Sequence, residues 1–284
     1  MVLIYVDDII VTGNAEDEID KLKLILGHQF AMKDLGELKC FLGIEVERSS
    51  NGMKITQQKY ALDLLKRFGL NDCKPAPTPM VLGQQLSQKE SHPVKHPEKY
   101  RSLVGALQYL TFTRPDITFA VNQVCQFMHD PREFFIQAAK RILRYVKGTL
   151  ADGLFFPTVK RQPNLVAYSD ANWGGDPDSR RSIKGFSVFF AGSLILWSSK
   201  KQRTVSRSSA KQKSRAMSDA TAERTWYRHL LSELGIKPNG LTLLCDNQSA
   251  IKLASNPLFH ARSKHIELDC HFVRKKKVED SLNC

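Results

Sequence analysis

Two adjacent carboxylates near the start of the chain, Asp7 and Asp8, have apolar residues on both sides. Residues 2–6 and 9–12 have the composition of two short strands, so the acids fall where the chain turns back. Two hard oxygen ligands at the tip of an apolar hairpin suit Mg²⁺. An ordinary acidic turn explains the same residues, because turns favour Asp. The motif by itself therefore leaves a metal site and a simple turn as open alternatives.

A second pair of acids, Asp170 and Asp246, lies in the second half of the chain. Each follows a short apolar run at or near the end of an expected strand, at residues 164–173 and 241–245. In α/β folds, binding sites form outside the ends of such strands. We therefore expect these two carboxylates to contribute to one site.

The elements that must position these acids divide the chain into four parts. Residues 1–70 are expected to hold two hairpins, the second at 41–56, and two helices. Residues 71–99 are a proline-rich connector, and three amphipathic helices follow within residues 100–150. Residues 164–280 are expected to hold three strands, a long helix, a fourth strand and two further helices. The predicted fold class is therefore α+β in the first part and α/β in the last.

The composition indicates a globular protein with an anionic partner. The 284 residues are 42% hydrophobic and 25% charged, and 42 Lys+Arg against 29 Asp+Glu give a net charge of +13. This balance favours nucleic acid or another polyanionic surface. No segment has the ~20 apolar residues of a membrane span, and no signal-peptide pattern opens the chain. The six cysteines form no C-x-x-C pair, which predicts reduced thiols and an intracellular location in cytoplasm or nucleus.

Basic side chains gather in two places. The third of the three helices carries Lys140, Arg141, Arg144 and Lys147 on its outer side, either as a solvated face or as a face that follows phosphates. Residues 200–215 include seven basic residues and no acid. That run is either the product of unselected mutation or a surface that binds duplex without cutting it. The residues predicted to bind nucleic acid are Lys200, Lys201, Arg203, Arg207, Arg180 and Arg181.

A series of short motifs runs through nearly the whole chain in a fixed order. They include Tyr-Val-Asp-Asp at 5–8, Phe-Leu-Gly-Ile-Glu at 41–45, Tyr-Arg-Ser-Leu-Val-Gly-Ala-Leu-Gln-Tyr-Leu at 100–110, Thr-Arg-Pro-Asp-Ile at 113–117, Tyr-Ser-Asp-Ala-Asn-Trp at 168–173 and Cys-Asp-Asn-Gln-Ser-Ala at 245–250. In this order they resemble the C-terminal part of a Ty1/copia-type retrotransposon Pol polyprotein, from the reverse-transcriptase palm through RNase H.

The resemblance implies a role for each acid pair. Asp7 and Asp8 match two metal-binding carboxylates of a reverse-transcriptase palm, which works by two-metal phosphoryl transfer. Asp170 and Asp246 match two carboxylates of an RNase H site, which hydrolyses the RNA strand of an RNA–DNA hybrid with two Mg²⁺ ions. The implied fold is a partial palm with a helical thumb or connection, followed by an RNase H-like mixed-sheet α/β domain. The hairpin at 41–56 resembles the element that positions the primer end.

The sequence departs from this family where the chemistry needs it most. The chain begins one strand before Asp7, without the first palm aspartate or the nucleotide pocket, so we expect no DNA synthesis by this chain alone. The family has Ser-Ser-x-Glu-x-Glu-Tyr-Arg-Ala at the start of the long RNase H helix. The corresponding residues 208–216 carry Lys211 and Lys213 at both glutamate positions. Each lysine replaces an ion ligand with a cation.

Other acids are not expected to substitute for the lost glutamates. Asp219 and Glu223 follow Lys211 by eight and twelve residues, which is about 12 and 18 Å along a helix that rises ~1.5 Å per residue. Glu267 and Asp269 are expected to be surface or capping charges. The family's last RNase H carboxylate lies beyond the final helix, and this chain ends at Cys284 without it, as after a frameshift or an early stop.

Three hypotheses about function remain. The chain is an active, Mg²⁺-dependent fragment that cleaves RNA in RNA–DNA hybrids, a catalytically inactive remnant that binds hybrid or duplex, or a decayed reading frame without a stable product. We favour the inactive, binding remnant, because both glutamate positions carry lysine. We also expect the first hairpin to be the weakest part of the structure, because Leu3, Ile9 and Val11 lack partners to pack against.

Overall fold

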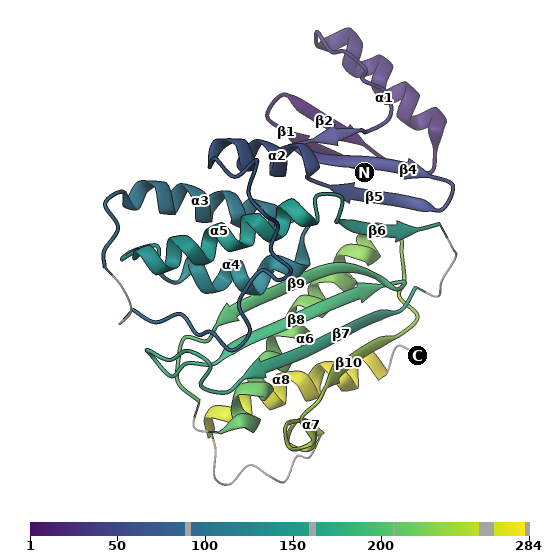
Figure 1. The fold of residues 1–284 in the computed structure, drawn as a ribbon. Helices are drawn as coiled ribbons and strands as arrows, with labels where there is room; N and C mark the ends of the chain where they lie inside the picture. Colours follow the sequence, from purple (N-terminus) through teal and green to yellow (C-terminus); the bar gives the residue numbers. More distant parts are fainter. Residues whose placement is uncertain (89–91, 159–162, 207, 256–263, 282–284) are drawn as a thin grey trace.

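The computed structural model describes residues 1–88, 92–158, 163–206, 208–255 and 264–281. Its helices and strands form a mixed α/β architecture with three separate sheets, in agreement with the predicted fold class at that level. Figure 1 shows a small ribbon of two strands at one end, a second sheet and a group of helices in the middle, and a third sheet with its own helices. Within these described ranges, every helix is too short or too polar to cross a lipid bilayer.

The first two strands form a sheet of their own. β1 (Val2–Tyr5) pairs antiparallel with β2 (Asp8–Val11) through a tight turn, in which Val6 has a φ of 50°. The next helix, α1 (Glu16–Gln29), buries none of its residues. The prediction that this hairpin exposes apolar side chains is confirmed for Leu3, which is 48% exposed, whereas Ile9 and Val11 are half-buried.

The second sheet joins the start of the chain to residues that follow the helices. Its strands are β3 (Cys40–Phe41), β4 (Ile44–Ser49), β5 (Gly52–Thr56) and β6 (Leu154–Pro157), in that spatial order. The hairpin expected at 41–56 is confirmed, but β6 was not predicted. β6 approaches β5 so closely that a Cβ at Gly52 or Gly153 would overlap main-chain oxygens of the opposite strand. Glycine at both positions is therefore what lets β6 join this sheet.

Four helices bury the largest core of the molecule. They are α2 (Gln58–Arg67), α3 (Pro97–Leu110), α4 (Thr118–Cys125), which the short 3₁₀ helix η1 (Pro115–Ile117) precedes, and α5 (Glu133–Gly148). Leu107, Phe135 and Ile142 are fully buried here, and Phe127 stacks on Phe135 with ring centroids 3.9 Å apart. Each such side chain contributes roughly 1.5–3 kcal/mol through burial. Helix α4 of this core packs against β9 (Ser193–Lys201) of the third sheet.

The basic side of α5 holds the proline-rich connector in place. Arg141 donates to Thr78 Oγ1 at 2.9 Å, Arg144 to the Lys74 carbonyl at 2.8 Å, and Lys147 to the Cys73 carbonyl at 2.7 Å. These three side chains are half-buried and engaged with the connector, so the solvated-face alternative is wrong for them, and the phosphate-following alternative stays a prediction. Their donors satisfy carbonyl and hydroxyl groups of residues 73–78, which the structure places in no strand or helix.

The third sheet combines one parallel and two antiparallel pairings. Its strands are β7 (Leu165–Asn172), β8 (Ile183–Phe190), β9 (Ser193–Lys201) and β10 (Leu241–Cys245), in the spatial order β10-β7-β8-β9, and β10 runs parallel to β7. Helix α6 (Ser209–Glu233) packs on one face, and α7 (Gln248–Ser255) and α8 (Lys264–Ser281) pack against α6 (Figure 1).

The opposite face of the third sheet meets the helices at β9. Trp197 Nε1 donates to the Thr111 carbonyl at 3.1 Å, and Lys201 Nζ donates to Gln126 Oε1 at 3.0 Å. These bonds fix the third sheet against α4. On β7 and β10, side chains that do not face α6 remain exposed, among them Tyr168 and Leu244.

Candidate functional site

The two acids of the second half meet at one end of the third sheet. β7 and β10 run parallel, and Ser169 pairs with Cys245, so Asp170 and Asp246 follow at the same end of neighbouring strands. Along β7, buried and exposed side chains alternate, which places Asp170 on the exposed set. The side chains of Asp170 and Asp246 are 74% and 67% exposed. The expectation that they share one site agrees with this geometry.

A lysine from α6 lies between these two carboxylates. Lys213 Nζ is 3.0 Å from Asp170 Oδ1 and also forms a short ion pair with Asp246 Oδ1. Its side chain is only 13% exposed. Lys211, the other lysine at a predicted glutamate position, forms no ion pair with any acid that the structure describes. Lys211 and Lys213, which have the same expected role in the sequence, are therefore in different environments.

The charges of this cluster stabilise one another. Partial burial alone would lower the pKa of Lys213, but hydrogen bonds to Asp246 and Asp170 outweigh it and raise the pKa above its ordinary value. The hydrogen bond from Lys213 lowers the pKa of Asp246. The Lys213 ammonium and the Asp246 carboxylate therefore remain ionised over the neutral range.

Buried amides fix the start of α6 beside β7. Gln212 Nε2 donates to the Ala171 carbonyl at 3.0 Å, and Gln202 Nε2 donates to the Gln212 carbonyl at 3.1 Å. Ser206 Oγ donates to Gln202 Oε1 at 3.2 Å. Gln212 and Gln202 are 1% and 4% exposed. The sequence analysis missed this network, because a glutamine in a basic run has no pattern that separates it from a surface residue.

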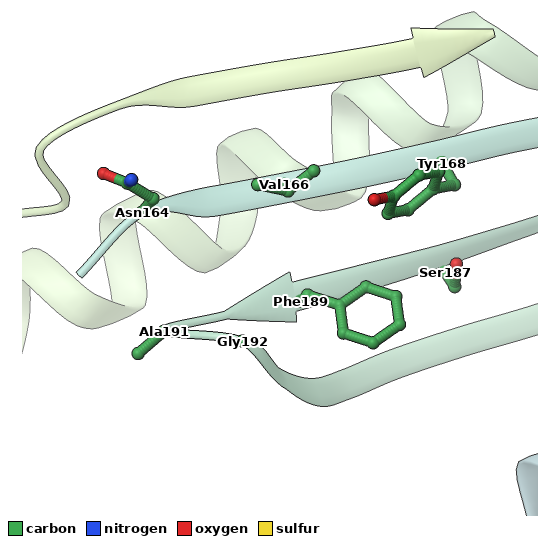
Figure 2. Close-up of a pocket in the computed structure, with 7 residues that line it drawn as sticks. All are labelled: Asn164, Val166, Tyr168, Ser187, Phe189, Ala191 and Gly192. Carbon is green, nitrogen blue, oxygen red and sulfur yellow. The ribbon is translucent and has the colours of Figure 1, made fainter. Parts of the chain in front are cut away.

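An open cleft extends from the acids along the exposed face of the sheet. It has a volume of about 760 Å³, and Asp170, Asp246, Tyr168, Trp197 and Phe119 are among the residues that line it. A neighbouring cavity of about 670 Å³ shares Tyr168 with this cleft. Figure 2 shows this cavity, with Tyr168 on β7 and Phe189 on β8 on facing strands. Their rings meet edge to face, with centroids 5.7 Å apart.

The predicted nucleic-acid-binding residues differ in how free they are. Lys200, Arg203, Arg180 and Arg181 are exposed. Lys201 instead forms a 2.8 Å ion pair with Asp176, which is 4% exposed, so its ammonium is already engaged. Burial alone would raise the pKa of Asp176, but hydrogen bonds from Lys201 and Ser179 hold it below its ordinary value. Arg207 lies outside the described residues.

Two of the acids considered as substitutes, Asp219 and Asp269, interact with cations elsewhere. Asp219 forms an ion pair with Lys184 of β8, and Asp269 lies 3.9 Å from the guanidinium of Arg215. The side chain of Glu267 lies outside the described part of the chain. These positions agree with the expectation that the other acids lie away from the site.

The first acid pair has a different setting. Asp7 occupies the turn between β1 and β2, whereas Asp8 already pairs with Tyr5 in the ladder, so the turn begins one residue earlier than expected. Both side chains are exposed. Among the residues that the structure describes, no group of three or more His, Cys, Asp or Glu side chains comes together. Neither acid pair therefore has a third such ligand in place.

The residues around Asp170 and Asp246 do not fit a resident Mg²⁺. Magnesium requires oxygen ligands at about 2.0–2.1 Å in near-octahedral geometry. The Lys213 ammonium instead lies between the two carboxylates and satisfies an oxygen of each. Two cations cannot share that position, because they repel each other and compete for the same oxygens.

Comparisons with known proteins find relatives over nearly the whole chain. The family model for reverse transcriptase (RNA-dependent DNA polymerase) matches residues 1–82. The chain is 44% identical over 281 residues to the retrovirus-related Pol polyprotein from transposon RE1 of Arabidopsis thaliana. The aligned region is 99% of this chain and 19% of that polyprotein. The chain is 38% identical over 292 residues to the Pol polyprotein from transposon TNT 1-94 of Nicotiana tabacum, with 99% and 22% covered.

A shorter relative is covered almost completely. An uncharacterized mitochondrial protein of Arabidopsis thaliana is 44% identical over 224 residues, which are 79% of this chain and 92% of that protein. Against the Pol polyproteins, in contrast, the chain spans about a fifth of their length.

Proposed function

The chain belongs to the reverse-transcriptase family of copia-type retrotransposon Pol polyproteins, and we propose that it binds RNA–DNA hybrid or duplex nucleic acid without cleaving it. The proposal divides the chain into a partial palm at 1–70, a connector at 71–99, a thumb or connection at 100–150 and an RNase H-like domain at 164–280. The family implies nucleic-acid substrates.

The RNase H-like assignment is supported by the third sheet. Three antiparallel strands, a parallel fourth beside β7, and a long helix after β9 bring Asp170 and Asp246 to one end of neighbouring strands. Two carboxylates so placed are the start of a metal-dependent phosphodiesterase site. A complete site needs further oxygen ligands, and the helix that would supply one supplies Lys213 instead.

The position of Lys213 is the observation that carries the proposal. An ammonium between Asp170 and Asp246 occupies the oxygens that would otherwise bind a metal ion. It also reduces the negative charge that would repel phosphates at this end of the sheet. Loss of ion binding and gain of phosphate tolerance both favour binding over cleavage.

The exposed cations supply the electrostatic part of binding. Lys200, Arg203, Arg180 and Arg181 belong to the same third-sheet unit as the acid pair. The whole chain has a net charge of +13. Contacts of this kind are made to phosphates, so the affinity should fall with salt and depend little on sequence.

Fluorescence anisotropy with a labelled RNA–DNA hybrid tests the binding half of the proposal. Wild type is expected to bind in EDTA and to lose affinity as salt rises. The double variant Lys200→Glu/Arg203→Glu should bind at least tenfold more weakly. Its matched control is Lys237→Glu/Lys252→Glu, which makes the same charge change at exposed positions after α6 and on α7. No binding by wild type, or equal losses in both double variants, would refute a binding surface at Lys200 and Arg203.

Gel analysis of the hybrid tests the other half. After incubation with Mg²⁺ or Mn²⁺, the RNA strand is expected to remain intact. The second candidate function, an active RNase H, is favoured by the meeting of Asp170 and Asp246 at one sheet end. Cleavage by wild type that Asp170→Asn abolishes would establish that function and overturn the non-cleaving proposal.

A further inference from the structure

We propose that Lys213 is a tethered cation that takes the place of a divalent ion between Asp170 and Asp246, so that this sheet end is assembled without metal and closed to it. The inference rests on the proposed function for one point only, the origin of the acid pair as an ion site. Its first support is geometric: one ammonium reaches an oxygen on each of two neighbouring strands.

The charges at the sheet end require a cation of some kind. Asp170 and Asp246 sit at adjacent ends of parallel strands, where two carboxylates without a counter-charge repel each other. The Lys213 ammonium supplies one positive charge within hydrogen-bond distance of both. It leaves the cluster with one net negative charge, whereas the bare pair has two.

The backbone around Lys213 aims its side chain at the acids. Gln212 and Ser214, its neighbours on α6, are 1% and 2% exposed and pack towards the protein interior. Gln212 is bonded to the Ala171 carbonyl of β7, so this turn of the helix cannot slide along the strand without breaking that bond. The ammonium is therefore delivered by a fixed helix rather than by a free surface chain.

Lys211 is a natural control within the same helix. It lies two positions before Lys213, which is roughly 200° around the helix axis at 3.6 residues per turn. Its main-chain N–H donates to Ser208 Oγ at the helix start, and its side chain is paired with none of the described acids. Changes at Lys211 alter the same amount of charge without touching the Asp170–Asp246 pair.

Manganese binding measures the inference without relying on activity. The full-length chain is titrated with Mn²⁺ in the absence of nucleic acid, and free Mn²⁺ is followed by electron paramagnetic resonance. Wild type and Lys211→Glu are expected to bind Mn²⁺ only weakly, whereas Lys213→Glu should bind one ion at least tenfold more tightly than either. Adding Asp170→Asn to Lys213→Glu should return the affinity to the wild-type value.

Lys213→Met keeps the length of the side chain and removes its charge, so it serves if Lys213→Glu does not fold. Its melting temperature should rise in Mn²⁺, and that of wild type should not. The inference is overturned if wild type binds Mn²⁺ as tightly as Lys213→Glu, if Lys211→Glu gains as much as Lys213→Glu, or if Mn²⁺ shifts wild type and Lys213→Met equally. Hybrid binding in EDTA reports on the proposed function separately, so failure of one is distinguishable from failure of the other.

Discussion

The two acid pairs of this chain have the same residue types and opposite surroundings. Asp7 and Asp8 lie on a ribbon of two strands whose apolar residues Val2, Leu3 and Ile4 are 46%, 48% and 67% exposed. Asp170 and Asp246 lie at the end of a four-stranded sheet with a helix packed on one face and fully buried Leu165 and Ala167 behind them. Among the described residues, a counter-charge is held in place at the second pair and not at the first. Packing, rather than the presence of adjacent carboxylates, decides which pair has a defined geometry.

The difference follows from what each strand has to pack against. Two strands alone bury little apolar surface and are marginal in water, whereas four strands with a helix bury a continuous face. The acids of the ribbon therefore help to identify the family, whereas the acids of the third sheet also have a defined geometry. The predictions below test this contrast from the largest expected effect to the smallest.

The largest contrast is expected from the same truncation on two strands. Leu165→Ala in β7 removes a side chain that is 0% exposed and should lower the free energy of unfolding by about 2–5 kcal/mol, because it leaves a cavity. Leu3→Ala in β1 should change it by less than about 0.5 kcal/mol. Urea unfolding followed by circular dichroism measures both. Similar losses for the two variants would mean that the ribbon is as well packed as the third sheet.

A buried ion pair should give the next largest effect, with a defined pH dependence. The pKa of Asp176 is below its ordinary value in the folded state, so its contribution to stability is present above about pH 4 and is lost as the pH falls through the folded pKa. Asp176→Asn should cost about 1.5–3 kcal/mol near pH 7, because Lys201 loses a charged partner.

The pH dependence supplies the control for this variant. Between pH 6 and pH 3 the urea midpoint of wild type should fall more steeply than that of Asp176→Asn, so the two curves should converge in acid. Parallel curves would show that Asp176 does not titrate differently in the folded and unfolded chains.

A smaller effect on stability is expected at the acid pair. Lys213→Met removes the ammonium between two largely exposed carboxylates, and such exposed pairs are worth about 1 kcal/mol or less. Added salt should reduce the difference from wild type, because it screens the repulsion that remains between Asp170 and Asp246. Thermal melting at low and high salt measures this, and a difference that grows with salt would argue against an electrostatic origin.

The smallest effect is expected at the ribbon. Asp7→Asn/Asp8→Asn should leave both the melting temperature and the affinity for an RNA–DNA hybrid within error of wild type, because these side chains are exposed and belong to no acidic cluster among the described residues. Asp170→Asn/Asp246→Asn is the matched pair of substitutions and should alter the electrostatics around Lys213. A larger loss of affinity in the first variant than in the second would reverse the comparison.

Most secondary structure followed from local pattern, and what did not follow depends on distant partners. The helix expected after the second hairpin within residues 1–70 is confirmed as α2, because amphipathic spacing is a local signal, and the long helix expected from about residue 208 is confirmed as α6. β6 was missed because a four-residue strand is too short to show a hydrophobic periodicity. It forms by pairing with β5, which precedes the helices in the sequence, whereas β6 follows them. The bonds from α5 to the connector were missed for the same reason.

The candidate site was predictable in its residues but not in its arrangement. Asp170 and Asp246 could be singled out from the strand pattern, and both lysines from the resemblance to the family. That Lys213 reaches both acids while Lys211 reaches neither depends on how α6 is rotated against β7, which Gln212 fixes through a buried hydrogen bond. No local pattern in the sequence encodes that rotation.

Anomalous diffraction at the manganese absorption edge tests the central claim most directly. Crystals of wild type and of Lys213→Glu would be soaked in the same Mn²⁺ solution. We predict that wild type shows the Lys213 ammonium between Asp170 and Asp246 with no anomalous peak there, and that Lys213→Glu shows a peak at that position. A manganese peak between the two carboxylates of wild type, with Lys213 turned away, would contradict the account.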